Sequence, residues 1–553
     1  MKEKLTKRSL KRIERSKLNT TVGLITSILM GIFSFVERTI FNQYFIEDYL
    51  GLYSFNYNII YTLGYIELGL STSIAFALYK PIEYNDKSQI IAIMRFFRKA
   101  YIAIGTFIII TGICLLPFLQ YLVQTSIPIT NVRVYFVIFL VANASSYIIA
   151  YKNVLFSANQ EDYILTLITN VSWTLLYIAE IIVAITTQNF LYYSIALFCG
   201  YQLKNFTMRF LANKSFKFLK TKEKPQISSD TMRMIKLNTK GMIYNRLGQV
   251  MVSTTDSVLI SSMVGTAILG KFSNYQMLYS GLITLALLIP KSITASIGNA
   301  GVTETKKTMV KSFYSLDLGS FFVYGFLTIM LICVANPIVS TFFGKNRVLD
   351  MSTVILYFCS FYLASQRELL LSYKSSLGLY WEDRHRPILE GITNLVASLI
   401  LGFYWGINGI LIGTIISQVF VNYMMEPLIV FHKGFKHSAY WYYISSSLRF
   451  ILVIAITAIC LIATNACSIM DKTSGILQIG SFSIPLGGFI QIIINFTISL
   501  GITFISFFLI FYKSESSKMI VRTLKVAFLN KAEKVKLAKH LEEKEKNRKR
   551  KNS

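Results

Sequence analysis

A glutamate and an arginine stand side by side in an apolar stretch, at Glu37 and Arg38 of the segment Asn19–Phe45. Such a stretch can span a bilayer, which takes roughly 20 helical residues, and a charge at membrane depth costs at least ~2.5–3.5 kcal/mol. On a helix, Arg38 shares one face with Gly23, Ser27, Gly31, Ser34 and Asn42. The segment predicts either a polar stripe that faces a solute or a structural arginine satisfied by neighbouring helices.

Two more arginines lie inside apolar segments. In residues 241–264, Arg246 falls on the same helical face as Asp256, and Arg367 stands beside Glu368 in SFYLASQRELLLSYKSS. The arginine side chain never deprotonates and meets phosphate oxygens with two parallel hydrogen bonds. The three arginines are therefore candidate ligands of an anionic solute, with structural ion pairs as the alternative for each.

Carboxylates accompany these cations, and the candidates are Glu37, Glu67, Asp256 and Glu368. They either pair with the arginines at rest or bind a coupling ion, H⁺ or Na⁺. A structural role is favoured for Glu67, in YIELGLS, and both roles stay open for Glu180, the one acidic residue of its span. Beyond such an ion, no cofactor is expected.

The sequence predicts neither an enzyme nor a metal site. The four histidines lie in or beside basic loops, and the six cysteines form no C-x-x-C pair. Neither a G-x-S-x-G nor a phosphate-binding loop occurs. The net charge of +28 comes from loops and both ends of the chain, so it indicates membrane orientation and contact with anionic lipid rather than nucleic acid.

The elements that must position these residues are membrane-spanning helices. The chain has 553 residues, of which 53% are hydrophobic and 15% charged, and its mean hydropathy is +0.51, values typical of an all-α polytopic membrane protein. Apolar runs predict about fourteen spans, near 19–45, 50–79, 97–124, 131–151, 163–187, 190–211, 241–264, 272–300, 312–343, 350–377, 386–405, 407–431, 440–465 and 484–512.

Charge predicts the orientation of these spans. Basic runs alternate with weakly charged loops, so that KRSLKRIERSK, RFFRK and NKSFKFLKTKEK all fall on one side when the number of spans is even. Since cytoplasmic loops carry the excess of Lys and Arg, both termini are expected to be cytoplasmic in the cell membrane. The lysine-rich tail predicts a solvated helix, with attachment to anionic lipid as the alternative.

An internal repeat divides the spans into two lobes. A shift of 219 residues places Leu50-Gly51-Leu52-Tyr53-Ser54 on Leu269-Gly270-Lys271-Phe272-Ser273, and Glu37 on Asp256. Six spans separate the paired positions, so two parallel six-helix lobes are expected to enclose a polar cavity. The predicted domains are a basic N-terminus (1–18), an N-lobe (19–211), a basic linker (212–240), a C-lobe (241–431), two further spans (440–512) and a basic tail (513–553).

Several segments in order resemble the Wzx-type oligosaccharide flippases of the polysaccharide transporter family, in the superfamily that also holds MATE drug exporters and lipid II flippases. The resemblance covers about residues 19–440, and it is carried by EDYLGLYSFNYNII, IELGLSTSIAFALYKP, STTDSVLISSMVGTAILGKFSNY, SITASIGN, LGLYWEDRHRPILEGITNLVASLILG and GINGILIGTIIS.

This resemblance implies a two-lobe transporter that moves undecaprenyl-pyrophosphate-linked oligosaccharide from the inner to the outer leaflet by alternating access. It implies that arginines bind the pyrophosphate, which fits Arg38, Arg246 and Arg367. It also implies a cytoplasmic motif that gates or braces the inner face, at Asp383, Arg384, Pro387 and Glu390. The implied partners are the lipid-linked oligosaccharide, anionic lipid, and a polysaccharide polymerase with glycosyltransferases.

Three rival functions are weaker. A MATE-type drug or cation antiporter favours a cavity dominated by carboxylates, whereas the cations here at least match them. A membrane glycan polymerase needs a large outer loop with Arg or His, and the expected outer loops are short. A non-transporting scaffold is the third. Arg38 lies near the outer end of its helix and Arg246 near the inner end of its own. We therefore expect the two cations to bracket a path for the solute and not to share one binding site.

Overall fold

The protein is an all-α polytopic membrane protein, as the apolar runs predict. The computed structural model describes residues 2–64, 67, 69–221, 223, 225–239, 254–286, 297, 305–379, 381–468, 476–479 and 482–518. Within these residues, nine helices are long and apolar enough to cross a membrane, and the longest, over residues 386–435, holds two of the predicted spans. Arg246 and most of SITASIGN lie outside the described residues.

The N-lobe contains the first six spans and two short helices at one end. Its elements are α1 (Lys2–Tyr44), α2 (Glu47–Gly64), α3 (Leu70–Glu83), α4 (Lys87–Leu115), η2 (Leu116–Phe118), α5 (Leu119–Leu122), α6 (Ile129–Ala150), α7 (Asn153–Ala158), α8 (Asp162–Thr187), α9 (Phe190–Ser215) and η3 (Lys217–Lys220). The predicted span 50–79 is broken before Gly69, whose left-handed backbone (φ 80°) suits glycine, so α3 turns away from α2.

The C-lobe follows, and two further helices pack on its side. The elements are α11 (Thr255–Leu259), η4 (Ile260–Val264), α12 (Thr266–Ala286), α14 (Lys306–Ile338), η5 (Val339–Phe343), η6 (Lys345–Arg347), α15 (Met351–Gln366), α16 (Glu368–Ser376), α17 (Arg386–Ser417), η7 (Gln418–Tyr423), α18 (Met424–Leu428), η8 (Ile429–Phe435), α19 (Tyr440–Ala466), β1 (Ile476–Ile479), β2 (Phe482–Pro485) and α20 (Leu486–Phe511). The antiparallel hairpin β1–β2, which pairs Ile476 with Pro485, is a small addition that the apolar pattern did not predict.

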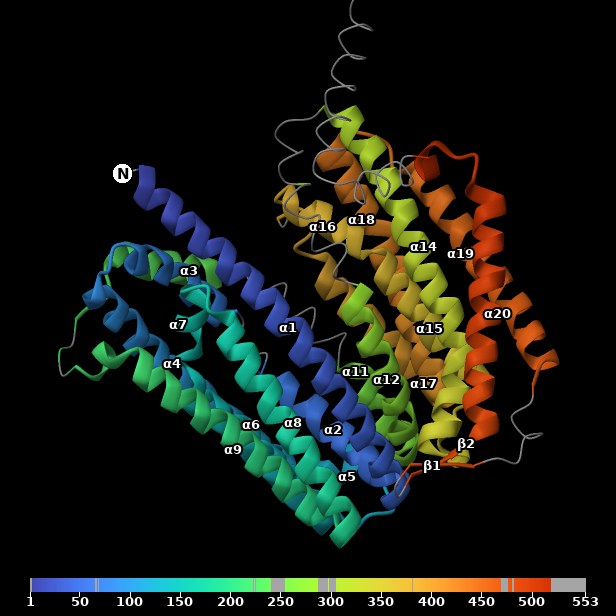
Figure 1. The fold of residues 1–553 in the computed structure, drawn as a ribbon, viewed down its shortest axis with the longest axis horizontal. Helices are drawn as coiled ribbons and strands as arrows, with labels where there is room; N and C mark the ends of the chain where they lie inside the picture. The colour runs from blue at the N-terminus through green and yellow to red at the C-terminus, as the bar shows by residue number, and fades with distance from the viewer. Residues whose placement is uncertain are drawn as a thin grey trace, which may run out of the picture.

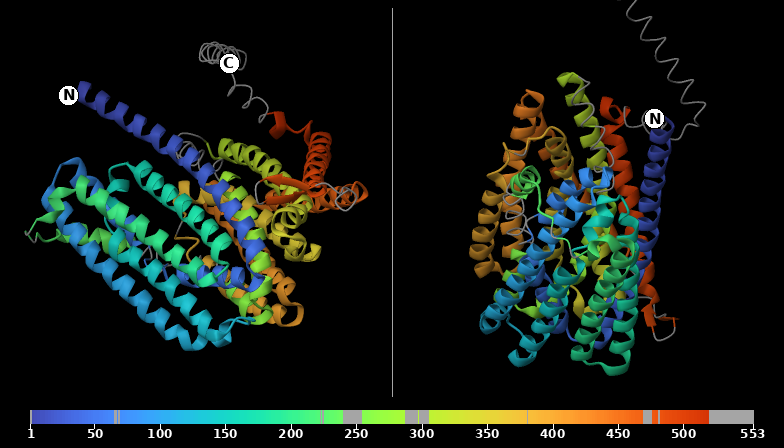
Figure 2. Two further views of the ribbon diagram at one scale, coloured as in Figure 1. Left: turned by 60° about the horizontal axis from the view of Figure 1, so that its bottom comes forward. Right: turned by 90° about the vertical axis from the view of Figure 1, so that its left-hand side faces the viewer.

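The two lobes meet at one end and diverge toward the other. In Figure 1 the N-lobe, from blue to green, and the C-lobe, from light green to red, touch at the bottom and spread apart toward the top, where the N-terminus lies. In the left view of Figure 2 the two bundles again lie side by side, whereas in the right view the N-lobe lies in front of the C-lobe. The contact at the bottom is formed mainly by α2 against α12, with the end of α1 and η5 beside them. We call this contact the seam.

Two glycines of the repeated motif lie at the centre of the seam. A Cβ on Gly51 would stand 1.9 Å from the backbone oxygen of Thr266, and one on Gly270 would stand 2.2 Å from that of Glu47. The 219-residue shift carries Glu47 onto Thr266 and Gly51 onto Gly270, so the two close approaches exchange under the repeat. The packing of α2 on α12 therefore agrees with an internal repeat, and glycine at both positions lets the backbones touch.

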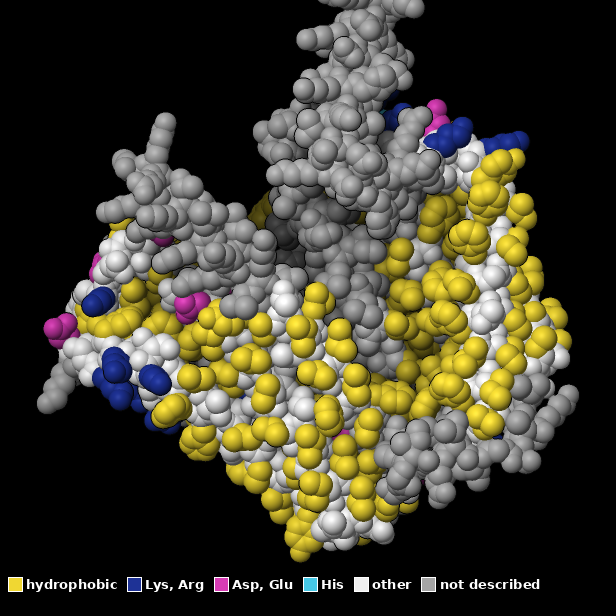
Figure 3. Space-filling view, viewed as in Figure 1, with side chains coloured by type: hydrophobic (Ala, Val, Ile, Leu, Met, Phe, Trp, Pro, Cys, Tyr) yellow, Lys and Arg dark blue, Asp and Glu magenta, His cyan; other side chains and the backbone are white. Residues whose placement is uncertain are grey.

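The lateral faces of both lobes suit lipid. Figure 3 shows hydrophobic side chains over most of these faces, while the Lys and Arg side chains in view gather at the diverging ends of the lobes. One apolar core runs through the N-lobe and across the seam, with Phe55 and Phe136 on one side and Phe272 and Phe358 on the other. Because this core is continuous, it joins the two lobes at the seam.

Candidate functional site

Glu37 and Arg38 are adjacent on α1, but their side chains contact different lobes. Arg38 donates from Nη1 to the Ser273 hydroxyl oxygen of α12 at 3.0 Å, across the seam. Glu37 is buried within the N-lobe, where it accepts a hydrogen bond of 2.5 Å from the Tyr193 hydroxyl of α9. Among the described residues, Arg38 forms an ion pair with no carboxylate at hydrogen-bonding distance. No other hydrogen bond of its guanidinium to the described residues is seen, so these residues leave donors of Arg38 for an anion.

Glu180 on α8 lies close to the same pair. Its side chain is 1% exposed, and neither carboxylate oxygen accepts a hydrogen bond from the described residues. Tyr193 is within electrostatic reach of both Glu180 and Glu37, but its single hydroxyl proton goes to Glu37. The N-lobe thus holds two acidic side chains around one tyrosine, a group that a proton or a small cation would stabilise.

The repeat is also visible in Asp256, the counterpart of Glu37. Its two carboxylate oxygens accept from the Thr414 hydroxyl at 3.1 and 2.9 Å, and Thr414 belongs to the sixth span of the C-lobe. Glu37 likewise bonds to the sixth span of its own lobe, at Tyr193. The first-helix carboxylate of each lobe therefore ties that helix to the lobe's last span. The relation of Asp256 to Arg246 lies outside the described residues.

The third arginine, Arg367, is already paired. Its Nε and Nη2 donate to the two oxygens of Glu426 at 3.0 and 2.9 Å, and its Nη1 lies 3.3 Å from Glu390. These groups belong to a buried set of three cations and three anions that we call the charge cluster: Arg367, Lys374, Asp383, Arg386, Glu390 and Glu426. Formal charge is balanced, so the structure places Arg367 in the ion pair that the sequence left as its alternative role.

The four residues of the motif predicted to be cytoplasmic have different surroundings. Asp383 binds Lys374 and Arg386, and Glu390 binds Arg386 at 2.7 Å, so both carboxylates belong to the charge cluster. Pro387 stands in the first turn of α17, where a missing N–H costs nothing. Arg384 points away and stacks its guanidinium 4.0 Å from the centre of the Trp381 ring. The motif thus braces the start of α17 against α16 and α18.

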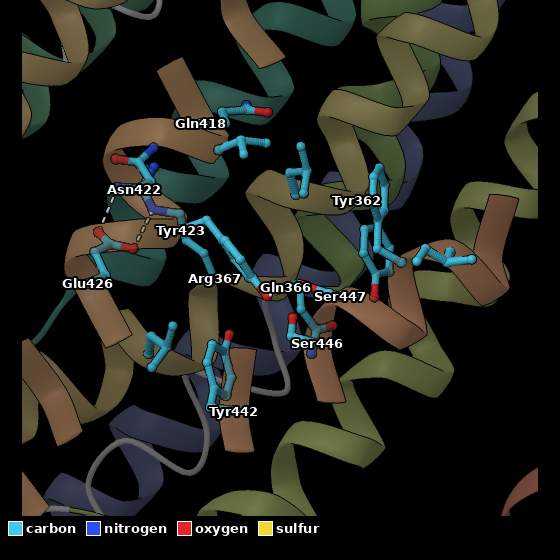
Figure 4. Close-up of a pocket in the computed structure, with 15 residues that line it drawn as sticks. Tyr362, Gln366, Arg367, Gln418, Asn422, Tyr423, Glu426, Tyr442, Ser446 and Ser447 are labelled. Carbon is cyan, nitrogen blue, oxygen red and sulfur yellow. Dashed lines mark hydrogen bonds and ion pairs between the residues drawn. The ribbon is translucent and has the colours of Figure 1, made fainter. Parts of the chain in front are cut away.

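A cavity of about 300 Å³ adjoins the charge cluster between α15, α16, η7, α18 and α19. Figure 4 shows Arg367 at its wall with the two interactions to Glu426 as dashed lines, and Tyr442 and Ser446 on the opposite side. Most of its surface is apolar. Since Arg367 is committed to its carboxylates, this cavity has little capacity for a phosphate.

A larger cavity, of about 570 Å³, lies inside the N-lobe, and we call it the aromatic cavity. Its wall carries aromatic rings from five helices and from the turn after α6: Tyr57, Tyr61, Phe97, Tyr101, Tyr147, Tyr151, Trp173 and Tyr201. Glu67 lies at the wall, where its Oε1 accepts from the Tyr101 hydroxyl at 2.6 Å and from the Ser71 amide at 3.2 Å. Glu368, in contrast, belongs to the C-lobe and faces Tyr279 and Tyr324.

Lys204 is the cation of the aromatic cavity. Its Nζ lies 4.9 Å from the centre of the Tyr201 ring and 5.5 Å from that of Trp173. No carboxylate among the described residues pairs with it. Trp173 in turn stacks on Tyr177 at 6.3 Å, and Tyr177 is within electrostatic reach of Glu37 and Arg38. Trp173 and Tyr177 thus lie between the cavity wall and groups that interact with the charged pair on α1.

Polar contacts close the seam around its glycines. The loop after α5 donates from the Gln124 amide to the Ser261 oxygen at 3.0 Å and accepts from the Thr266 amide at 2.8 Å, while Asp48 accepts from the Thr266 hydroxyl. On the opposite side, Arg347 donates to the Asn42 oxygen at 2.9 Å and pairs with Glu47 at 3.3 Å. Burial lowers the pKa of Arg347, and Glu47 opposes that shift.

Sequence reasoning named some of these residues and missed others. Lys204, Glu426, Asp317 and Arg449 each stand inside a predicted span, where any ionisable residue is a candidate for function. Their position inside apolar spans could therefore have identified them from the sequence. In the structure, Asp317 and Arg449 form a further buried ion pair. Arg347 lies in an expected outer loop, and its burial against α1 could not be foreseen from its position.

The fold defines a class of membrane protein rather than a single function. No family model matches the chain, and no curated protein matches it. The lipid II flippase MurJ, in an inward closed conformation, is similar with a TM-score of 0.57 at 14% identity, covering 88% of this chain and 99% of MurJ. An inward-facing multidrug resistance MATE family transporter of the MOP superfamily has a TM-score of 0.59 at 11% identity, covering 79% and 99%. At these identities the likeness shows that this chain shares the fold of these two proteins.

Proposed function

We propose that the protein is a flippase that carries undecaprenyl-pyrophosphate-linked oligosaccharide repeat units across the cell membrane for capsular or exopolysaccharide synthesis. The fold is shared with MurJ, a lipid II flippase, and with MATE transporters. The segments from EDYLGLYS to GINGILIGTIIS resemble the Wzx-type flippases, as described above. The N-lobe receives the substrate, and the seam between the two lobes opens to release it.

The observation that carries the proposal is the state of Arg38. This arginine lies at the seam, on the side of the N-lobe that meets the C-lobe, where it is bonded to one serine and to no carboxylate among the described residues. A guanidinium whose fork is free matches a pyrophosphate, which offers two oxygens at the required spacing. Arg367 differs, because Glu426 already occupies its fork. Of the two candidate arginines that the structure describes, Arg38 is therefore the one we assign to the pyrophosphate.

Alternating access follows from the closed seam. With both termini cytoplasmic, as the loop charges predict, the seam lies at the outer face and the lobes diverge toward the cytoplasm. The substrate head then enters from the inner leaflet while the polyprenyl tail stays in lipid. Opening of the seam and closure of the diverging ends would present the glycan outside.

Cation antiport in the manner of the MATE transporters is the alternative function. One observation favours it: the acidic pair Glu37 and Glu180, buried around Tyr193, suits a proton or small cation. Against it stand Arg38 and Lys204, two cations that pair with no carboxylate among the described residues and would repel a cationic drug. A coupling ion at the acidic pair is compatible with the flippase proposal as well. The two functions are therefore distinguished by an assay of the transported substrate.

The test is a flipping assay in proteoliposomes with lipid-linked oligosaccharide. We expect Arg38→Ala to lower the rate at which glycan becomes accessible to an impermeant lectin by at least about tenfold, because a charge-assisted bidentate contact is lost. Arg38→Lys should recover part of the rate, since lysine keeps the charge but not the fork. Arg246→Ala tests the second predicted arginine in the same way.

The matched control is Arg233→Ala, which removes an exposed arginine between the lobes in sequence. It should leave the rate unchanged. A normal rate for Arg38→Ala would refute the assignment of Arg38, and a wild-type protein that exports a cationic dye without moving lipid-linked oligosaccharide would establish the alternative function.

A further inference from the structure

We propose that the aromatic cavity of the N-lobe binds the sugar part of the substrate and selects glycans that carry an acidic group, which Lys204 recognises. The inference rests on the proposed function, because it names the substrate class of that transport path. It concerns a site separate from Arg38: the cavity takes the glycan, whereas the arginine takes the pyrophosphate of the carrier.

The wall of the cavity matches a sugar ring in shape and chemistry. A pyranose has faces of C–H bonds, which pack on aromatic rings, and a rim of hydroxyls, which needs hydrogen-bonding groups. Tyr57 and Tyr61 stand parallel, with ring centres 5.7 Å apart and planes 9° apart, and each is nearly half exposed. Trp173 and Tyr201 meet edge to face at 5.1 Å. These rings provide flat surfaces for more than one sugar unit.

Polar side chains complete the wall between the rings. They are Ser71, Thr72, Asn143, Ser146, Asn153 and Ser157. Hydroxyl and amide groups both donate and accept, so they can follow the varied hydroxyl pattern of an oligosaccharide. A cavity of about 570 Å³ has room for one to two sugar units rather than a whole repeat.

Lys204 gives the cavity its charge preference. A partly buried ammonium without a carboxylate is costly, and contact with two aromatic rings offsets only about 0.5–2 kcal/mol of that cost. The other ionisable group at the wall, Glu67, already accepts hydrogen bonds from Tyr101 and the Ser71 amide. An anion on the ligand would therefore pair with Lys204, and a neutral sugar would leave it unpaired.

The anion has two possible sources, a carboxylate on the sugar or the pyrophosphate of the carrier. Lysine is a single point charge, whereas pyrophosphate is met better by a guanidinium fork. The rings around Lys204 also need an apolar surface on the ligand, which an acidic sugar has and a free pyrophosphate lacks. We therefore assign the acidic group to the glycan.

The experiment measures binding to the full chain in nanodiscs by calorimetry. The probes are glucuronosyl-glucose, cellobiose and inorganic pyrophosphate; the two disaccharides differ chiefly in one carboxylate. We expect the acidic disaccharide to bind at least about tenfold more tightly than cellobiose. Lys204→Gln should remove this difference while leaving the affinity for cellobiose, and Lys204→Arg should keep it. Tyr57→Ala should weaken both disaccharides by a similar factor.

Lys214→Gln is the matched control, because Lys214 lies on the same helix, is exposed and does not line the cavity. It should leave every affinity unchanged. Equal binding of both disaccharides by the wild-type protein would overturn the inference without reference to any variant. So would competition by pyrophosphate at equal or higher affinity that depends on Lys204, because the site would then belong to the carrier.

This binding measurement is independent of transport. A protein that selects the acidic disaccharide but fails the flipping assay contradicts the proposed function alone. A protein that flips lipid-linked oligosaccharide but does not distinguish the two disaccharides contradicts this inference alone.

Discussion

Replacing Gly51 with alanine is expected to hold the lobes apart at the seam and to stop transport. The new Cβ would lie 1.9 Å from the Thr266 oxygen, which belongs to the backbone of α12 and cannot rotate away. Gly270→Ala meets the Glu47 backbone in the same way, at 2.2 Å. Overpacking of this kind costs about 1–3 kcal/mol, which shifts an equilibrium between closed and open seam by roughly five- to 150-fold.

The state of the seam is measured through Ser273, which is 6% exposed beside Arg38 in the closed form. In a background without the native cysteines, Ser273→Cys should react faster with an impermeant thiol reagent when Gly51 is alanine. Gly281→Ala is the control, because Gly281 lies on the same helix as Gly270 with open space where its Cβ would stand. Unchanged reactivity together with a normal flipping rate in Gly51→Ala would show that the seam does not need this contact.

The importance of Gly51 and Gly270 could be foreseen in part. The repeat placed both glycines at equivalent positions, and parallel lobes related by an axis along the membrane normal must bring equivalent elements together somewhere. The sequence does not show which face of α2 meets α12. Because this span is apolar on most sides, its helical periodicity does not mark one face as the contact face. The spans were therefore predictable from hydropathy, whereas their contacts were not.

The partners of the arginines likewise could not be predicted from the sequence. Arg38 and Arg367 look alike in sequence, since each stands beside a glutamate in an apolar run. Glu37 accepts a hydrogen bond from Tyr193, and Arg367 donates to Glu426, 59 residues away. Adjacent residues on a helix point in different directions, so an ion pair inside a bundle is decided by residues from other helices. The charged residues could be identified from the sequence, but their ion-pair partners could not.

Replacing Glu426 with glutamine is expected to destabilise the protein more than any other single charge removal proposed above. Its carboxylate is 1% exposed and serves three cations: Arg367 at 2.9 Å, Arg386 at 3.1 Å and Lys374 at 3.7 Å. Glutamine keeps the shape but leaves the charge cluster with one uncompensated positive charge in a buried place. Breaking a buried ion pair from one side costs about 3–5 kcal/mol, because the remaining charge loses its partner but stays out of water.

Thermal unfolding of the purified protein in detergent measures this loss, with two variants that isolate its cause. Glu515→Gln removes a carboxylate from an exposed pair with Lys311, whose side chains are 84% and 66% exposed, so it should cost at most about 1 kcal/mol. The double variant Glu426→Gln with Arg367→Gln restores neutrality and should be more stable than the sum of the two single changes. If the two single losses simply add, the cluster is held by packing rather than by charge balance, and the bracing role of Asp383 and Glu390 at the start of α17 would lose its electrostatic basis.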